Sequence, residues 1–86
     1  MKWKGGNVAG KLPRGWQRWQ LGERLSWLRG YNGYTLSLSK AAKEMGLTKA
    51  HLWELEDGRA SNPTLKTLLA ICRVYDISIQ KLTEGL

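Results

Sequence analysis

The chain has 86 residues and a formal net charge of +7 at pH 7, with 42% hydrophobic and 24% charged residues. This composition is typical of one small globular domain, and no segment approaches the roughly 20 apolar residues that a membrane span needs. One cysteine and one histidine exclude an intrachain disulfide framework and a repeated His/Cys zinc pattern. No apolar run follows the basic N-terminal residues, so we expect no secretory signal and a cytoplasmic protein.

Nearly all of the excess positive charge lies in the N-terminal third. Residues 1–29 hold seven bases and one acid, whereas residues 30–86 hold seven bases and six acids. A basic leading segment often adds phosphate contacts to a neutral domain. The alternative is that this charge only keeps the protein in solution.

The first fifteen residues contain four glycines, one proline and few apolar side chains. Such a segment cannot bury a core, so we predict a flexible basic arm over 1–15 and one domain over 16–86. The basic side chains of this arm are Lys2, Lys4, Lys11 and Arg14.

After Trp16, apolar residues recur at helical spacing without the alternation of strands. A first helix is predicted from the stripe formed by Leu21, Leu25 and Leu28, and the Asn-Gly pair at 32–33 ends it.

The start of this helix leaves two readings open. If it reaches back to Trp16, then Trp16, Trp19 and Trp27 form a second apolar stripe that needs a partner. This partner is a second copy of the chain, another protein, or the chain's own arm folded back with Trp3 and Leu12. If it begins near Gln20, Trp16 and Trp19 cap the domain instead.

Side-chain caps and glycines mark two short helices in the middle of the chain. Ser37 is predicted to cap the second helix, and Gly46 to end it. Thr48 is predicted to cap the third, which ends at Gly58. The residues expected to face inward are Ala41, Ala42, Met45, Leu52 and Leu55.

Two more helices complete the prediction. Asn62-Pro63 is expected to open the fourth as a cap followed by proline, and Ser78 to begin the fifth. The fourth is expected to bury Leu65, Leu68, Leu69 and Cys72 with Tyr75 at its edge, and the fifth carries Ile79 and Leu82. The sequence therefore predicts an all-α fold of five helices and no sheet.

The segment at 37–58, SLSKAAKEMGLTKAHLWELEDG, resembles the helix-turn-helix of the Cro-type (XRE) phage-repressor family. The similarity continues through the loop and fourth helix at 59–69. It implies sequence-specific binding of double-stranded DNA by a transcriptional repressor or autoregulator, encoded by a prokaryote or a phage and acting as a homodimer. Dimers of this family more often use the last helix, so the resemblance also implies a dimer surface at Ile71, Val74, Ile79 and Leu86. For an antitoxin-like member, it implies a cognate toxin as a further partner.

In this family the third helix lies in the major groove, with its first residues against base edges. By position, the residues implied to read bases are Thr48, Lys49, Ala50, His51 and Glu54. Those implied to bind phosphate are Ser37, Arg59 and Asn62. The resemblance also implies an ion pair between Arg29 and Glu56, with Glu56 only about 70° from the apolar stripe of its helix.

The outward face of the third helix does not suit phosphates by itself. Its residues are Ala50, Trp53, Glu54 and Asp57, which include two carboxylates and no base. This face favours an alternative function, a protein-interaction adaptor that binds a partner through exposed tryptophans. The basic arm favours DNA.

Other chemistry lacks support in the sequence. His51 has no partner for metal binding or base catalysis, and Cys72 fits a buried thiol. Glu54, Glu56 and Asp57 share one helix without a visible pocket. We therefore expect no enzyme activity, metal or cofactor.

Overall fold

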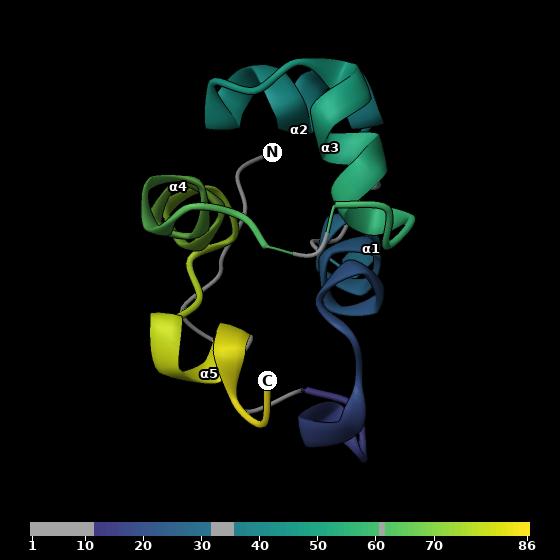
Figure 1. Ribbon diagram of the computed structural model, residues 1–86, viewed down its shortest axis with the longest axis vertical. Coiled ribbons are helices and arrows are strands. Elements are labelled where there is room, and N and C mark those ends of the chain that lie inside the picture. The colour runs from purple at the N-terminus through teal and green to yellow at the C-terminus, as the bar shows by residue number, and fades with distance from the viewer. Residues whose placement is uncertain (1–11, 32–35, 61) are drawn as a thin grey trace.

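The computed structural model describes residues 12–31, 36–60 and 62–86. Within these ranges the chain forms five α-helices after one short 3-10 helix, and no strand (Figure 1). The predicted all-α fold is confirmed. The elements are η2 (Trp16–Arg18), α1 (Leu21–Tyr31), α2 (Leu38–Met45), α3 (Lys49–Glu56), α4 (Leu65–Tyr75) and α5 (Ile79–Thr83).

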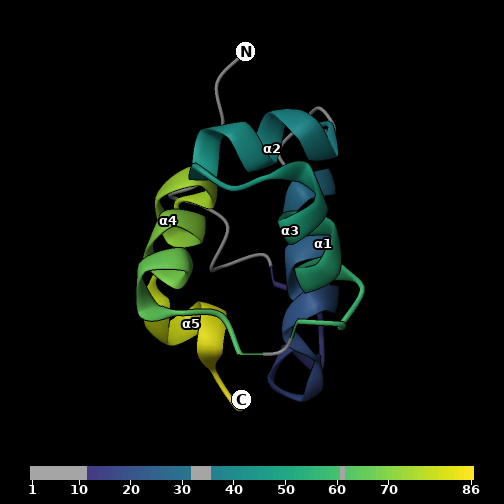
Figure 2. The same ribbon diagram turned by 45° about the horizontal axis from the view of Figure 1, so that its top comes forward.

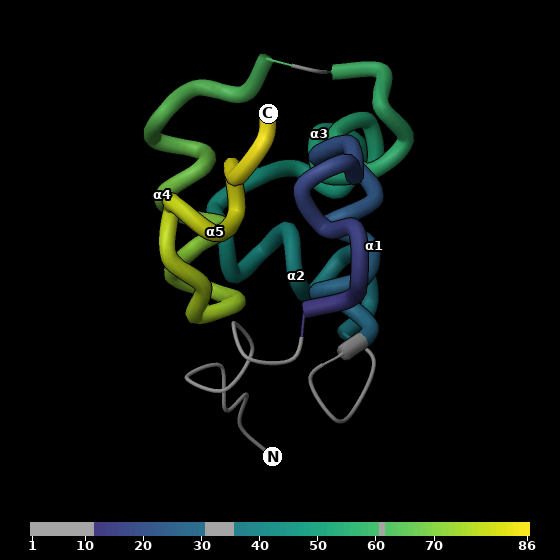
Figure 3. Tube along the Cα trace, turned by 90° about the horizontal axis from the view of Figure 1, so that it is seen from below, coloured from purple at the N-terminus to yellow at the C-terminus, as the bar shows by residue number. Residues whose placement is uncertain are grey.

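The helices enclose one core. In Figure 1, α1 and α3 lie on the right, α4 and α5 on the left, and α2 crosses the top. Contacts join α1 to α3, and they join α2 to both α3 and α4, while α5 packs on α1 and α4. Figures 2 and 3 show the same arrangement from two other directions, with α4 opposite α1. The helix-turn-helix of α2 and α3 therefore lies at one end of the molecule.

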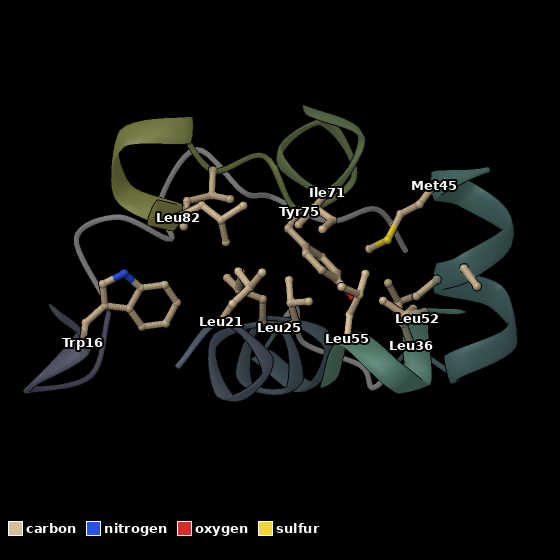
Figure 4. Packing of buried hydrophobic residues seen from close by; sticks show 14 residues of the cluster. Trp16, Leu21, Leu25, Leu36, Met45, Leu52, Leu55, Ile71, Tyr75 and Leu82 are labelled. Atoms are coloured by element: carbon tan, nitrogen blue, oxygen red, sulfur yellow. The ribbon is translucent and has the colours of Figure 1, made fainter. Parts of the chain in front are cut away.

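The core consists of the apolar stripes of these helices (Figure 4). As predicted, the three leucines of the α1 stripe and the inward residues of α2 and α3 are buried. Residues that join them in the core include Trp16, Leu36, Ile71, Tyr75, Ile77 and Leu82.

Hydroxyl side chains begin the helices as predicted. Ser37 Oγ accepts a hydrogen bond from the Lys40 backbone N–H at 3.1 Å. Thr48 Oγ1 accepts from His51 N–H at 3.0 Å, and Ser78 caps α5 in the same way. Gly46, with φ of 75°, ends α2 in the left-handed conformation. These local contacts fix the turn between α2 and α3.

The predicted start of α4 is wrong. Its N-cap is Thr64, whose Oγ1 accepts from Thr67 N–H at 3.2 Å, and the helix begins at Leu65. Asn62 and Pro63 precede the cap. A threonine hydroxyl satisfies the same orphan donors that an Asn side chain would, and it lies two residues later.

The predicted inner face of α4 is also wrong. Leu65 and Leu69 are 64% and 51% exposed, while Ile71 and Tyr75 are fully buried, and Leu68 and Cys72 are only partly buried. Because α4 is apolar at most positions, its periodicity allows several stripes, and packing on α2 and α5 selects one of them. Burial of Ile71 also removes it from any dimer surface.

The tryptophans do not form an outer stripe on α1. The helix begins at Leu21, as in the second reading of the sequence. Trp19 has extended backbone angles, so the helix does not continue back to Trp16. Trp16 is 2% exposed, and its Nε1 donates to Lys81 O at 2.7 Å. Its ring lies 5.7 Å from that of Trp19 and 5.9 Å from that of Trp27. Trp16 is therefore a core residue and not part of a free interface.

The side chain of Arg24 is fully buried, which the sequence did not predict. Its Nη1 donates to Leu82 O at 2.8 Å and its Nε to Trp19 O at 3.0 Å. The guanidinium lies 5.1 Å from the centre of the Trp16 ring. Burial lowers the pKa of Arg24. Through these two hydrogen bonds, Arg24 connects the segment before α1 to α5.

Part of the predicted arm is described. Leu12 packs against the core, and the N–H of Trp16 donates to Pro13 O at 3.3 Å. Lys2, Lys4 and Lys11 lie outside the described residues, as does the loop at 32–35. Within the described ranges, no helix has the length and apolar character required to cross a bilayer.

Candidate nucleic-acid interface

The third helix is held from one side only. Leu52 and Leu55 are buried against the core, and contacts with α1 and α2 fix the helix axis. All the predicted base-reading residues, at 48–51 and at Glu54, are exposed. One side of α3 is therefore anchored, while the methyl group of Ala50 and the carboxylate of Glu54 lie on the opposite face and the amine of Lys49 and the imidazole of His51 lie on its flanks.

An ion pair locks α3 onto α1. Arg29 Nε and Nη2 donate to the two carboxylate oxygens of Glu56 at 2.8 and 3.0 Å. Arg29 Nη1 donates to Leu36 O at 2.9 Å. The hydrogen bond to Glu56 raises the pKa of Arg29 above its ordinary value. The predicted pair is confirmed, and Glu56 consequently has a structural position, not a place on the outward face.

The predicted phosphate-binding residues lie in two places. Ser37 is exposed at the N-terminus of α2, where its Oγ already caps the helix. Arg59 and Asn62 are exposed in the connection between α3 and α4. These positions lie before and after α3 in the chain.

Arg59 follows α3 in the chain, and its side chain lies against the outward face of that helix. Helical spacing did not predict this contact. Arg59 Nε donates to Asp57 Oδ2 at 2.7 Å, and its guanidinium lies 4.9 Å from the centre of the Trp53 ring. Trp53 is 44% exposed. The acidic character predicted for this face is therefore offset at Asp57, while Glu54 has its carboxylate in solvent.

The remaining candidates give no second site. Cys72 is partly buried, and burial raises the pKa of its thiol, which disfavours the reactive thiolate. Over the described residues, no three His, Cys, Asp or Glu side chains gather where they could hold a metal ion. Arg14 is exposed and is the arm base that the structure describes.

Comparison with known proteins gives consistent matches. A family model described as a helix-turn-helix domain matches residues 20–84. The HTH-type transcriptional regulator SinR of Bacillus subtilis is 31% identical over 64 residues, which are 74% of this chain and 56% of SinR. This chain thus spans about half the length of that relative.

Solved structures agree with the sequence match. A crystal structure of SinR in complex with DNA superimposes with a TM-score of 0.66 at 32% identity, over 73% of this chain and 97% of the other. The restriction-modification controller protein C.AhdI from Aeromonas hydrophila has a TM-score of 0.64 at 29% identity, over 72% and 89% of the two chains.

Proposed function

Because this chain belongs to the helix-turn-helix domain family of Cro-type repressors, we propose that it binds double-stranded DNA sequence-specifically and regulates transcription as a repressor or autoregulator. The observation that carries this proposal is α3, a helix capped by Thr48, fixed on its inner face and free on its outer one. Such a helix fits the major groove. The crystal structure of SinR with DNA, a relative of the same fold, supports it.

The exposed side chains of α3 have the chemistry to read base edges. Lys49 can donate to guanine O6 and N7, the methyl group of Ala50 can pack on a thymine methyl, and Glu54 can accept from cytosine N4. Thr48 and His51 flank them on the same exposed surface. Ser37, with the free N–H groups at the start of α2, would bind one phosphate, and Arg59 and Asn62 others.

The test is selection of bound sequences from a random duplex pool at physiological salt. We expect enrichment of one palindromic sequence, because two copies of the domain would bind half-sites about one helical turn apart. A pool that stays random would contradict sequence-specific binding.

The proposed homodimer predicts a mass in solution of twice the 9.8 kDa of one chain. Its surface would include the 61% exposed Leu86, which lines an open pocket with Leu68 and Pro63. Light scattering measures this mass, and Leu86→Ser should lower it. A monomeric parent at concentrations where it binds a palindrome would contradict a preformed dimer.

The basic arm should strengthen DNA binding without changing its specificity. Replacing Lys2, Lys4 and Lys11 by glutamine should reduce the salt dependence of affinity, by about 0.9 log unit for each phosphate that these lysines neutralise. The preferred sequence should stay the same, because phosphate contacts position the protein and do not read bases. An unchanged slope in a salt titration would show that these three lysines contact no phosphate.

The adaptor function is the second candidate. The exposed leucines of α4, Leu65 and Leu69, favour it, because they lie one turn apart and could seat a protein partner such as a cognate toxin. Replacing both by serine should abolish binding of such a partner and leave DNA binding intact.

For either of the two candidate functions, we propose that the protein acts in the cytoplasm.

A further inference from the structure

We infer that Trp53 and Arg59 form one composite contact to the DNA backbone, in which the indole ring of Trp53 positions the Arg59 guanidinium to donate to a phosphate. This inference rests on the proposed function, since it names a contact of the same interface. It assigns Trp53 a positioning role that neither base reading nor the adaptor function gives it.

The backbone places Arg59 beside the last turn of α3. The N–H groups of Arg59 and Ala60 both donate to Glu54 O, at 2.9 and 3.2 Å. Gly58, with φ of 82°, allows the chain to turn back in this way. The Cα of Arg59 is consequently tied to the helix that presents the reading residues, although Arg59 itself follows the end of that helix.

Two further contacts fix the side chain of Arg59. Its Nε edge donates to Asp57, and the flat guanidinium covers the Trp53 ring. An ion pair as exposed as this one, 67% for Arg59 and 44% for Asp57, adds little to folding stability. Its main effect is to orient the guanidinium. Among the described residues, the two terminal nitrogens of Arg59 have no hydrogen-bond partner, so the edge opposite Asp57 is available for a ligand.

Charge and position identify that ligand as a phosphate. A planar guanidinium edge with two N–H groups matches the geometry of phosphate oxygens. In the docking mode of this fold the start of the third helix enters the groove, so a group beyond its end is near the groove rim, where the backbone runs. Pairing with Arg59 also offsets the charge of Asp57, which would otherwise repel that backbone.

The ring of Trp53 is the specific part of the inference. One indole face is covered by Arg59, so removal of the ring should act through Arg59. An exposed cation–π contact is worth about two- to fivefold in an equilibrium constant. Trp53→Leu should therefore weaken DNA binding by about this factor, whereas Trp53→Tyr, which keeps an aromatic face, should bind like the parent.

A double-mutant cycle on the sequence enriched by the parent tests this inference. The four proteins are the parent, Trp53→Leu, Arg59→Gln and the double variant, each titrated with DNA from about 50 to 200 mM salt. Arg59→Gln should lower the salt slope by about 0.9. In that background Trp53→Leu should have no further effect. Lys81→Gln, a 45% exposed base in α5, which lies across the molecule from α3 in Figure 1, is the charge-matched control and should leave the slope unchanged.

Each contrary outcome has its own meaning. An unchanged slope in Arg59→Gln overturns the phosphate contact. A weakening by Trp53→Leu that persists in the Arg59→Gln background overturns the positioning role, because the ring would then act on its own. Thermal melting of all variants should match the parent, because both side chains are exposed. A parent that enriches no sequence contradicts the proposed function instead, and the inference falls with it.

Discussion

Gly22→Ala is expected to destabilise the protein by about 3 kcal/mol, at the upper end of what overpacking costs. A β-carbon at this position would lie 2.7 Å from the backbone oxygen of Leu55, and it would also overlap the carbonyl of Glu56. Both obstacles are backbone, so no flexible side chain can move away. Helices α1 and α3 would have to separate, which would displace the base-reading face.

The same helix provides the control. Gly30 has open space around the position of a β-carbon, so Gly30→Ala should leave stability unchanged or raise it by up to about 1 kcal/mol through helix propensity. Urea unfolding of the two variants measures the difference. Equal midpoints would contradict the close approach of α1 and α3 at Gly22.

Glu56→Ala is the second change with a large expected effect. It leaves the Arg29 guanidinium with Leu36 O as its remaining partner and removes both hydrogen bonds between α1 and α3. Breaking a buried pair costs about 3–5 kcal/mol, and because Arg29 keeps 22% of its side-chain surface exposed we expect about 3 kcal/mol. Glu54→Ala, on the exposed face of the same helix, should change stability by no more than about 0.5 kcal/mol.

Thermal or denaturant unfolding compares these two glutamate variants directly. Glu56→Ala and Arg29→Ala should each be less stable than the parent. The double variant should be destabilised by less than the sum of the two single effects. Similar melting temperatures for Glu56→Ala and Glu54→Ala would mean that the pair does not hold α3 in place.

Local chemistry predicted much of this fold. Ser37, Thr48 and Ser78 cap helices as expected, because a hydroxyl followed by a helical run satisfies orphan N–H groups within one turn. The stripe of α1 also follows from sequence, because Leu21, Leu25 and Leu28 recur at i, i+4 and i+7. For α4 the apolar residues surround most of the helix, so tertiary packing and not periodicity selects Ile71 and Tyr75.

The sequence did not predict contacts between segments that lie far apart in the chain. Burial of Trp16 and Arg24 depends on carbonyls of α5, Lys81 O and Leu82 O, which lie about sixty positions later in the chain. The composite of Trp53, Asp57 and Arg59 was missed for a related reason. Helical spacing ends at Asp57, and only the turn at Gly58 returns the next residue to the ring of Trp53.

That α3 is the interface stays a prediction, whereas the structure corrects the charge expected for its outward face. The resemblance to Cro-type repressors located the exposed face of α3, and the acids on it suggested repulsion from DNA. The structure offsets one of them, Asp57, by the 2.7 Å contact with Arg59. Glu54 retains a free carboxylate, as an acceptor for cytosine requires.

The central claim is that exposed side chains of α3 read DNA sequence, and base preference in α3 variants tests it most directly. Selection from a random duplex pool should be repeated with Lys49→Ala and Glu54→Ala. We expect each variant to lose preference at its own base pairs, by about 1–3 kcal/mol at a bidentate contact, while the rest of the preferred sequence persists. Base preferences identical to those of the parent in both variants would contradict the claim that α3 is the reader.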